Sequence, residues 1–165
     1  MRALALLPVL AAALVLAPTA WAPAPAKGVF VPGESLGGVE LRMTKAEVRE
    51  LWGSRFGVCR NCEHPTWYFN LKPFEPHGAG VEFRRDRVAR AFTLWRPLGW
   101  RTAEGLELGV QLDGLEDAVP GLAVRPCEGY AAYVDEGRRA TSVYYVFRGR
   151  LWGFALMSPP VSPCL

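Results

Sequence analysis

The chain has 165 residues, which is enough for one ordinary domain or two very small ones. Hydrophobic residues make up 50% of the sequence and charged residues 21%, so a folded chain is expected and a disordered one is not. The formal net charge of +3 is too small to indicate nucleic acid or an anionic membrane as a partner.

The first 26 residues are predicted to be a signal peptide. Arg2 gives a short positive start, and residues 3–17 form an apolar stretch of the length that signal peptides have. Small residues offer three cleavage positions, after Ala20, Ala22 or Ala26. The alternative is an uncleaved anchor helix, but the apolar stretch is short for a membrane span and contains Pro8. We therefore expect a secreted or extracytoplasmic protein, without stable membrane insertion after cleavage.

Four cysteines follow the predicted signal peptide: Cys59, Cys62, Cys127 and Cys164. In an exported protein an even number of cysteines indicates two disulfides, and four cysteines allow three pairings. We favour Cys59–Cys62, a local bridge in a bent loop, and Cys127–Cys164, which would hold the last residues of the chain. Because the second bridge closes the larger loop, it should stabilise the protein more.

The chain contains a weak internal repeat. Residues 38–53 (GVELRMTKAEVRELWG) match residues 105–120 (GLELGVQLDGLEDAVP), and residues 81–94 match residues 144–157. In the first copy Thr44 and Glu47 have the spacing of a helix capping box. Asp113 and Glu116 offer a shifted capping box in the second copy.

Six strands are predicted from alternating or continuous apolar runs. They are Trp67–Leu71, Ala79–Arg84, Val88–Trp95, Tyr130–Val134, Thr141–Phe147 and Leu151–Met157. The sequence therefore predicts an α+β fold of two tandem repeats, each a helix packed on one side of a three-stranded antiparallel meander. The predicted boundaries are a linker over residues 27–35, a first repeat over residues 36–97 and a second over residues 98–165.

The Cys59–Cys62 region is the sharpest local motif. A C-x-x-C pair forms a structural bridge, a redox centre or half of a zinc site, and His64 and His77 are the histidines that could join a metal. A redox pair needs its first cysteine at a helix start, whereas this one follows a helix and precedes a strand. We favour the structural bridge and expect both histidines to lie in loops, with no catalytic, metal or cofactor site.

Arginines and aromatic residues are the candidate binding residues. The arginines cluster on one predicted hairpin, where they would either contact an acidic partner or keep an edge hairpin soluble. The aromatic side chains would either form a shared core or an exposed binding surface, where Tyr, Trp and Arg are enriched. The candidate surface consists of Trp67, Phe69, Tyr130, Tyr144, Trp152, Arg84 and Arg87.

The pattern G-V-x-L-x-M-T-x-x-E-V-x-x-L-x-G at residues 38–53, followed by a meander, resembles the SmpA/OmlA-like modules of the bacterial envelope. Two such units in tandem resemble the beta-lactamase inhibitor protein architecture. The resemblance implies two helix-on-sheet units side by side, which form one longer curved sheet that binds proteins.

These observations predict a secreted, non-enzymatic binding module whose partner is a protein or a cell-envelope component. The alternative is an exported enzyme, or a thiol or metal protein, that uses the Cys59, Cys62 and His64 region. The sequence identifies neither the partner nor the oligomeric state.

Overall fold

The computed structural model describes residues 25–72, 75–94 and 99–165, without the side chains of residues 70–77. The described chain consists mostly of β-strands, and its two helices have only eight and seven residues. The predicted α+β class is therefore wrong, because strands dominate and do not form separate helix-plus-meander units. The predicted signal peptide lies almost entirely outside the described residues.

Fourteen elements form the described chain. The first half contains β1 (Gly28–Val31), β2 (Ser35–Leu36), β3 (Val39–Glu40), α1 (Lys45–Trp52), β4 (Gly57–Val58), β5 (Thr66–Lys72), β6 (Glu75–Arg84) and β7 (Arg87–Leu94). The second half contains β8 (Trp100–Thr102), α2 (Leu112–Ala118), β9 (Ala123–Cys127), β10 (Tyr130–Glu136), β11 (Thr141–Phe147) and β12 (Arg150–Met157).

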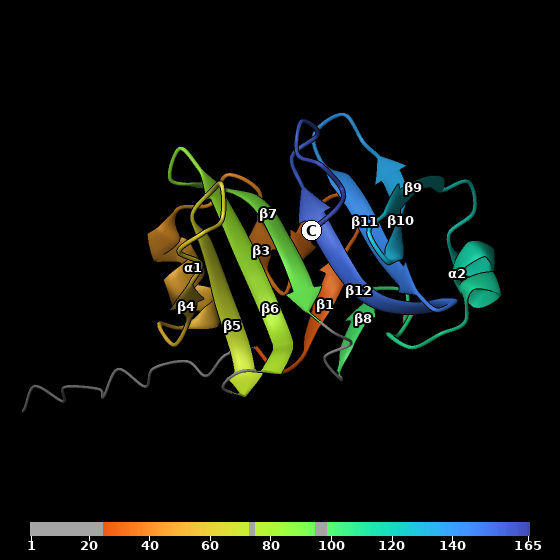
Figure 1. Cartoon of the computed structure of the whole chain (residues 1–165), viewed down its shortest axis with the longest axis horizontal. Helices are drawn as coiled ribbons and strands as arrows, with labels where there is room; N and C mark the ends of the chain where they lie inside the picture. The colour runs from red at the N-terminus through yellow and green to blue at the C-terminus, as the bar shows by residue number, and fades with distance from the viewer. Residues whose placement is uncertain (1–24, 73–74, 95–98) are drawn as a thin grey trace, which may run out of the picture.

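One antiparallel sheet of eight strands spans the molecule, in the order β4-β5-β6-β7-β12-β11-β10-β9 (Figure 1). The two halves of the chain join where β7 pairs with β12, so that Phe92 lies opposite Ala155 and Arg90 opposite Met157. All six predicted strands are present within this sheet, and Trp95, the predicted end of one of them, lies outside the described residues. Because the two meanders share one continuous sheet, they also share the residues that pack on each of its faces.

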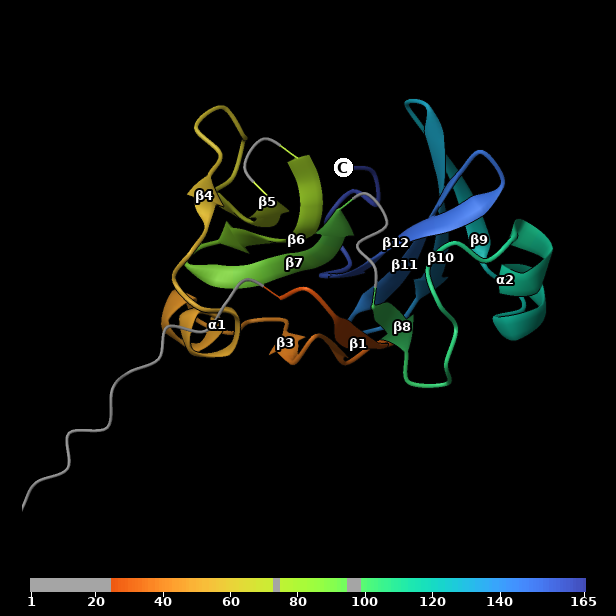
Figure 2. The same ribbon diagram turned by 90° about the horizontal axis from the view of Figure 1, so that it is seen from below.

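A second sheet of four strands, in the order β3-β2-β1-β8, covers one face of the large sheet (Figure 2). Its strand β1 pairs with β8 in parallel, which joins the beginning of the described chain to the second half. Residues 27–35, the predicted linker, thus include a strand whose Phe30 is fully buried. The predicted boundary between residues 97 and 98 stays a prediction.

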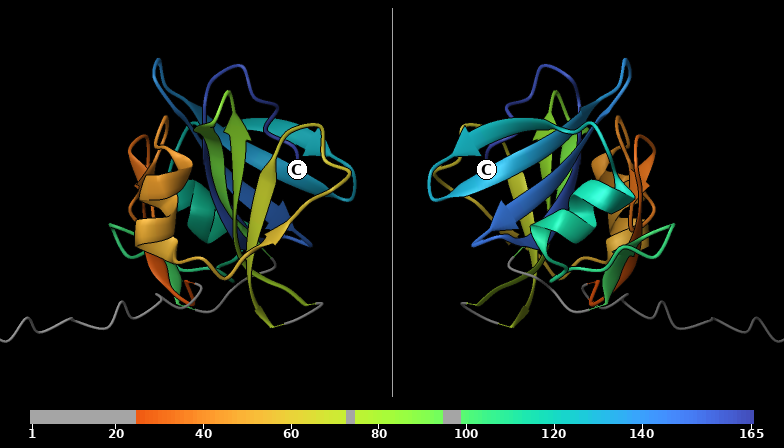
Figure 3. Two further views of the ribbon diagram at one scale, coloured as in Figure 1. Left: turned by 90° about the vertical axis from the view of Figure 1, so that its left-hand side faces the viewer. Right: turned by 90° about the vertical axis from the view of Figure 1, so that its right-hand side faces the viewer.

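The face of the large sheet beneath the small sheet, here called the first face, carries the main core. Phe30 and Trp100 of the small sheet and Trp52 of α1 pack there against strand residues such as Phe69 and Phe154. Both helices lie on this side (Figure 3). A helix of eight residues is only about 12 Å long and cannot cover a meander alone. The small sheet therefore supplies the cover that was predicted for the helices.

The capping box of α1 is confirmed. Thr44 accepts a hydrogen bond from the backbone N–H of Glu47, and the Glu47 carboxylate accepts one from the backbone N–H of Thr44 at 2.6 Å. The hydrogen bonds that the Thr44 backbone N–H and hydroxyl donate to the Glu47 carboxylate lower the pKa of Glu47. The shifted capping box predicted for α2 is wrong, because α2 begins after Gln111 and no side chain caps it.

Candidate functional site

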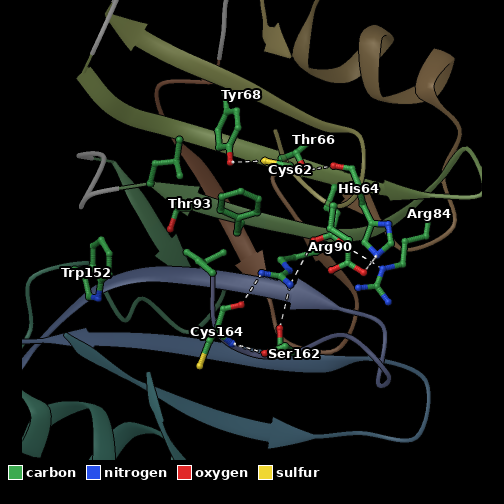
Figure 4. Close-up of a pocket in the computed structure, with 15 residues that line it drawn as sticks. Cys62, His64, Thr66, Tyr68, Arg84, Arg90, Thr93, Trp152, Ser162 and Cys164 are labelled. Atoms are coloured by element: carbon green, nitrogen blue, oxygen red, sulfur yellow. Dashed lines mark hydrogen bonds and ion pairs between the residues drawn. The ribbon is translucent and has the colours of Figure 1, made fainter. Parts of the chain in front are cut away.

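An open cavity of about 440 Å³ lies on the opposite face of the large sheet, here called the second face (Figure 4). Strand alternation explains why its side chains gather there, because Tyr68, Phe92 and Leu94 point away from the neighbouring first-face residues. The lining residues are Cys62, Glu63, His64, Thr66, Tyr68, Glu82, Arg84, Arg90, Phe92, Thr93, Leu94, Trp152, Ser162, Cys164 and Leu165.

Aromatic and aliphatic side chains form one part of the cavity wall. The rings of Tyr68 and Phe92 meet edge to face with centroids 6.1 Å apart, and Leu94 and Trp152 extend this apolar part. Burial raises the pKa of the Tyr68 hydroxyl. The neutral phenol is therefore the form that this part of the wall presents to a ligand at neutral pH.

Three charged side chains on β6 and β7 form the polar end of the cavity. Glu82 lies between two guanidinium groups: Arg84 Nε donates to Oε1 at 3.0 Å, and Arg90 Nη2 lies 3.3 Å from Oε2. Glu82 and Arg90 are paired across the two strands and are both buried. A buried ion pair of this kind requires further polar partners, and the last residues of the chain provide them.

The segment of residues 158–165 lies across the second face and forms one side of the cavity. Arg90 donates to the carbonyl oxygens of Ser162 and Cys164 at 3.1 and 3.0 Å. The Cys127–Cys164 disulfide ties the segment to β9, and Val161 within the segment is buried. This pairing confirms the predicted bridge and fixes one border of the cavity.

The Cys59–Cys62 disulfide is confirmed as well, and it fixes the opposite border of the cavity. The Cys62 sulfur lies 3.8 Å from the Tyr68 hydroxyl, and His64 Nε2 lies 3.6 Å from a Glu63 carboxylate oxygen. Within the described residues no cysteine is free. Among all the described residues, no three or more His, Cys, Asp or Glu side chains lie close enough together to hold a metal ion.

The structure separates the candidate binding residues into two groups. Trp67, Phe69 and Tyr144 are buried in the core of the first face. Their strand positions alternate toward the small sheet, so they are core residues in this structure. Arg87 lies in the β6–β7 hairpin and is exposed, outside the cavity lining.

The remaining candidates, Arg84, Tyr130 and Trp152, belong to the second face. Arg84 and Trp152 line the cavity, and Tyr130 packs against Trp152 with ring centroids 5.7 Å apart. His64 lies in a loop as expected, whereas His77 lies within β6 and its side chain is not described.

The predicted candidate surface leaves out several cavity residues, among them Tyr68, Glu82, Arg90 and Phe92. Alternation places Tyr68 opposite Trp67 and Phe69, which is the signal that could have identified it. Glu82 and Arg90 are paired in the β6–β7 hairpin, with Phe92 two residues further along β7, and residues 158–165 then fold back over β7 to close one side of the cavity. Sequence spacing contains no signal for that long-range arrangement.

No protein-family model matches the chain, and no curated protein matches it. Among solved structures, an extracellular protein containing an SCP domain from Bacillus anthracis shares 11% identity at a TM-score of 0.48, over 72% of this chain and 44% of that protein. A DUF4309 family protein from Bacillus subtilis shares 15% identity at a TM-score of 0.49, over 74% of this chain and 84% of that protein. Neither is described as an SmpA/OmlA-like module, so that resemblance stays a prediction.

Two disulfides indicate an extracytoplasmic protein, because thiols in the cytoplasm are kept reduced. Among the described residues, neither helix has the length and hydropathy that crossing a bilayer requires.

Proposed function

We propose that this protein is an extracytoplasmic, non-catalytic binding module, which binds a protein or a cell-envelope component at the second-face cavity. The observation that carries the proposal is that both disulfides contribute to the cavity borders, through Cys62 and Cys164. A site whose two sides are covalently held keeps its shape before binding, and such preorganisation lowers the cost of association.

The composition of the cavity also supports binding. Ligand sites are concave and mostly apolar, with a few polar groups that orient the ligand, and they usually measure roughly 300–1,000 Å³. This cavity combines an apolar wall around Tyr68 and Phe92 with one cluster of charges around Glu82. Its volume of about 440 Å³ lies within that range.

The test is recovery of a partner from culture medium and from an envelope fraction by the immobilised protein. The wild-type protein and the control Val124→Ala, on the exposed outer strand β9, should recover the same partner in stoichiometric amount. Tyr68→Ala, which removes part of the cavity wall, should recover much less of it. Equal recovery by Tyr68→Ala would contradict binding at the cavity.

Mass spectrometry of the recovered partner tests the non-catalytic part of the proposal. The partner should have the same mass before and after prolonged incubation with the wild-type protein. A mass change that the wild-type protein causes and Tyr68→Ala does not would instead indicate an enzyme acting at this cavity.

A further inference from the structure

The polar end of the cavity gathers two guanidinium groups around one buried carboxylate. The buried Glu82 carboxylate faces two guanidinium groups, and each of its oxygens already has a partner, Arg84 for one and Arg90 for the other. One carboxylate is thus shared between two guanidinium groups at this end. Glu63 is a second acid of the lining, but its side chain is 88% exposed and screened by water.

The two arginines are not equally available to a ligand. Arg90 is buried and is committed to Glu82 and to the carbonyl oxygens of residues 162 and 164. Arg84 is 37% exposed at its side chain and uses only its Nε toward Glu82. Within the part of the chain that the structure describes, its two terminal NH2 groups make no hydrogen bond. Arg84 thus presents a paired donor edge, the geometry that binds a carboxylate.

The apolar wall continues away from this charge. Figure 4 shows Trp152 on one side of the cavity and His64 and Arg84 on the other, with Tyr68 between them along one wall. A molecule that fills the cavity therefore meets aromatic surface along its body and a cation at one end.

We infer that the cavity takes an amphipathic carboxylate, with its carboxylate against Arg84 beside His64 and its apolar body along Tyr68, Phe92 and Trp152. The inference rests on the proposed function and adds the chemical class of the ligand. Two sources carry this chemistry, a small fatty acid of the cell envelope and the carboxyl end of a protein partner with apolar last residues.

Calorimetric titration with octanoate and its uncharged analogue octanamide tests the role of the charge. The wild-type protein should bind octanoate about tenfold more tightly than octanamide, since a hydrogen bond to a charged group contributes roughly 1.5–3 kcal/mol. Arg84→Gln should abolish this preference, and Arg84→Lys should retain part of it. Arg87→Gln, which removes the same charge from the same hairpin outside the cavity, should leave the preference unchanged.

The apolar wall and the ligand source are tested separately. Tyr68→Ala should weaken the binding of octanoate and of octanamide by the same factor, because it removes contacts that both ligands make.

The ligand source is tested with a tetrapeptide that ends in Phe-Leu. If the source is a peptide, the form with a free carboxylate should bind more tightly than the amidated form, as octanoate binds more tightly than octanamide. If only octanoate binds, the source is a small acid.

Two outcomes overturn the inference. If the wild-type protein binds octanoate and octanamide equally well, the cavity binds apolar molecules without selecting a carboxylate, and the proposed binding function remains. If neither octanoate nor the carboxylate peptide binds, while Tyr68→Ala still loses the partner recovered by affinity, the ligand class is wrong but the site is right. Loss of the preference in Arg87→Gln would also contradict the role of Arg84.

Discussion

Arg90 holds together three parts of the molecule at the joint between β7 and β12. Its guanidinium contacts Glu82 on β6 and the two carbonyl oxygens of the 158–165 segment, while its strand position pairs with Met157. Because the side chain is buried, its removal would leave a carboxylate in a poorly solvated place with only Arg84 as a partner. Arg90 is therefore expected to matter for stability before it matters for binding.

Replacing Arg90 by methionine should lower the free energy of unfolding by about 3 kcal/mol, since breaking a buried ion pair leaves an uncompensated charge. The double variant Glu82→Gln/Arg90→Met should recover part of this loss because it removes that charge as well. Urea unfolding of the two variants measures the difference. A double variant less stable than Arg90→Met would show that the isolated carboxylate is not the source of the loss.

Tyr145 predicts how stability changes at alkaline pH. Burial raises its pKa well above the ordinary value, although the nearby Arg90 charge acts in the opposite direction. A raised folded-state pKa means that the contribution to stability is complete below about pH 10 and is lost as the pH rises toward the folded-state value. Tyr68, Tyr133 and Tyr144 add shifts in the same direction, with burial raising the pKa of Tyr144 to about 12.

Tyr145→Phe should therefore lose stability less steeply than the wild-type protein above pH 10. The difference in slope should approach one proton, about 1.4 kcal/mol per pH unit. Unfolding free energies measured between pH 8 and pH 11.5 give both slopes. Identical slopes would show that the Tyr145 hydroxyl ionises as readily in the folded protein as in the unfolded chain.

Among the elements, β6 has a glycine at the position where the Phe92 ring of β7 approaches its backbone. Gly80 lies opposite Phe92 on β7, and a Cβ at Gly80 would overlap the Phe92 ring. The ring thus lies flat over the glycine and contributes to the cavity wall. A strand glycine that admits a close approach from a neighbour is a recognised use of this residue.

Gly80→Ala is expected to displace the Phe92 ring and to weaken octanoate binding several-fold, with a smaller effect on secondary structure. Titration calorimetry measures the binding, and far-ultraviolet circular dichroism checks the fold. Ala79→Gly, the adjacent position on the first face, is the control that changes the same strand without touching the cavity. Unchanged octanoate binding in Gly80→Ala would remove Phe92 from the site.

Which elements were predictable follows from their length. The strands β5–β7 and β10–β12 have seven to ten residues each, long enough for alternation and hairpin turns to identify them. The strands β1–β3 and β8 have two to four residues, which is too short for alternation to identify them, and β1 lies within the predicted linker of residues 27–35. The small sheet could therefore not be predicted from the sequence, and without it the fold class could not be predicted either.

At the scale of the whole molecule, the two disulfides act on chain segments of very different length. Cys59–Cys62 spans 3 residues of sequence separation and Cys127–Cys164 spans 37. The favoured pairing, one local bridge and one that holds the last residues of the chain, is confirmed, although four cysteines allow three pairings. The course of residues 158–165 across the second face was not predictable, since it depends on Arg90 and on the β7–β12 joint.

Replacing Cys127 and Cys164 by serine should cost about 4 kcal/mol of stability, against about 2 kcal/mol for Cys59 and Cys62, because the longer loop gains more entropy in the unfolded chain. Thermal and urea unfolding compare the two double variants. Both variants should also weaken octanoate binding, since each frees one border of the cavity. A larger loss of stability from the short bridge would contradict the loop-length argument.

The most direct test of the binding account is chemical-shift mapping by nuclear magnetic resonance during titration of the folded, oxidised protein with octanoate. We predict that the shifts concentrate on the second face, at the Trp152 indole N–H and the backbone amides of Tyr68 and Phe92. The indole N–H of Trp52, which donates to the Gly37 carbonyl oxygen on the first-face side, should not move. Shifts confined to the first face would contradict the account, whereas no shift at any residue would show that the ligand class is wrong.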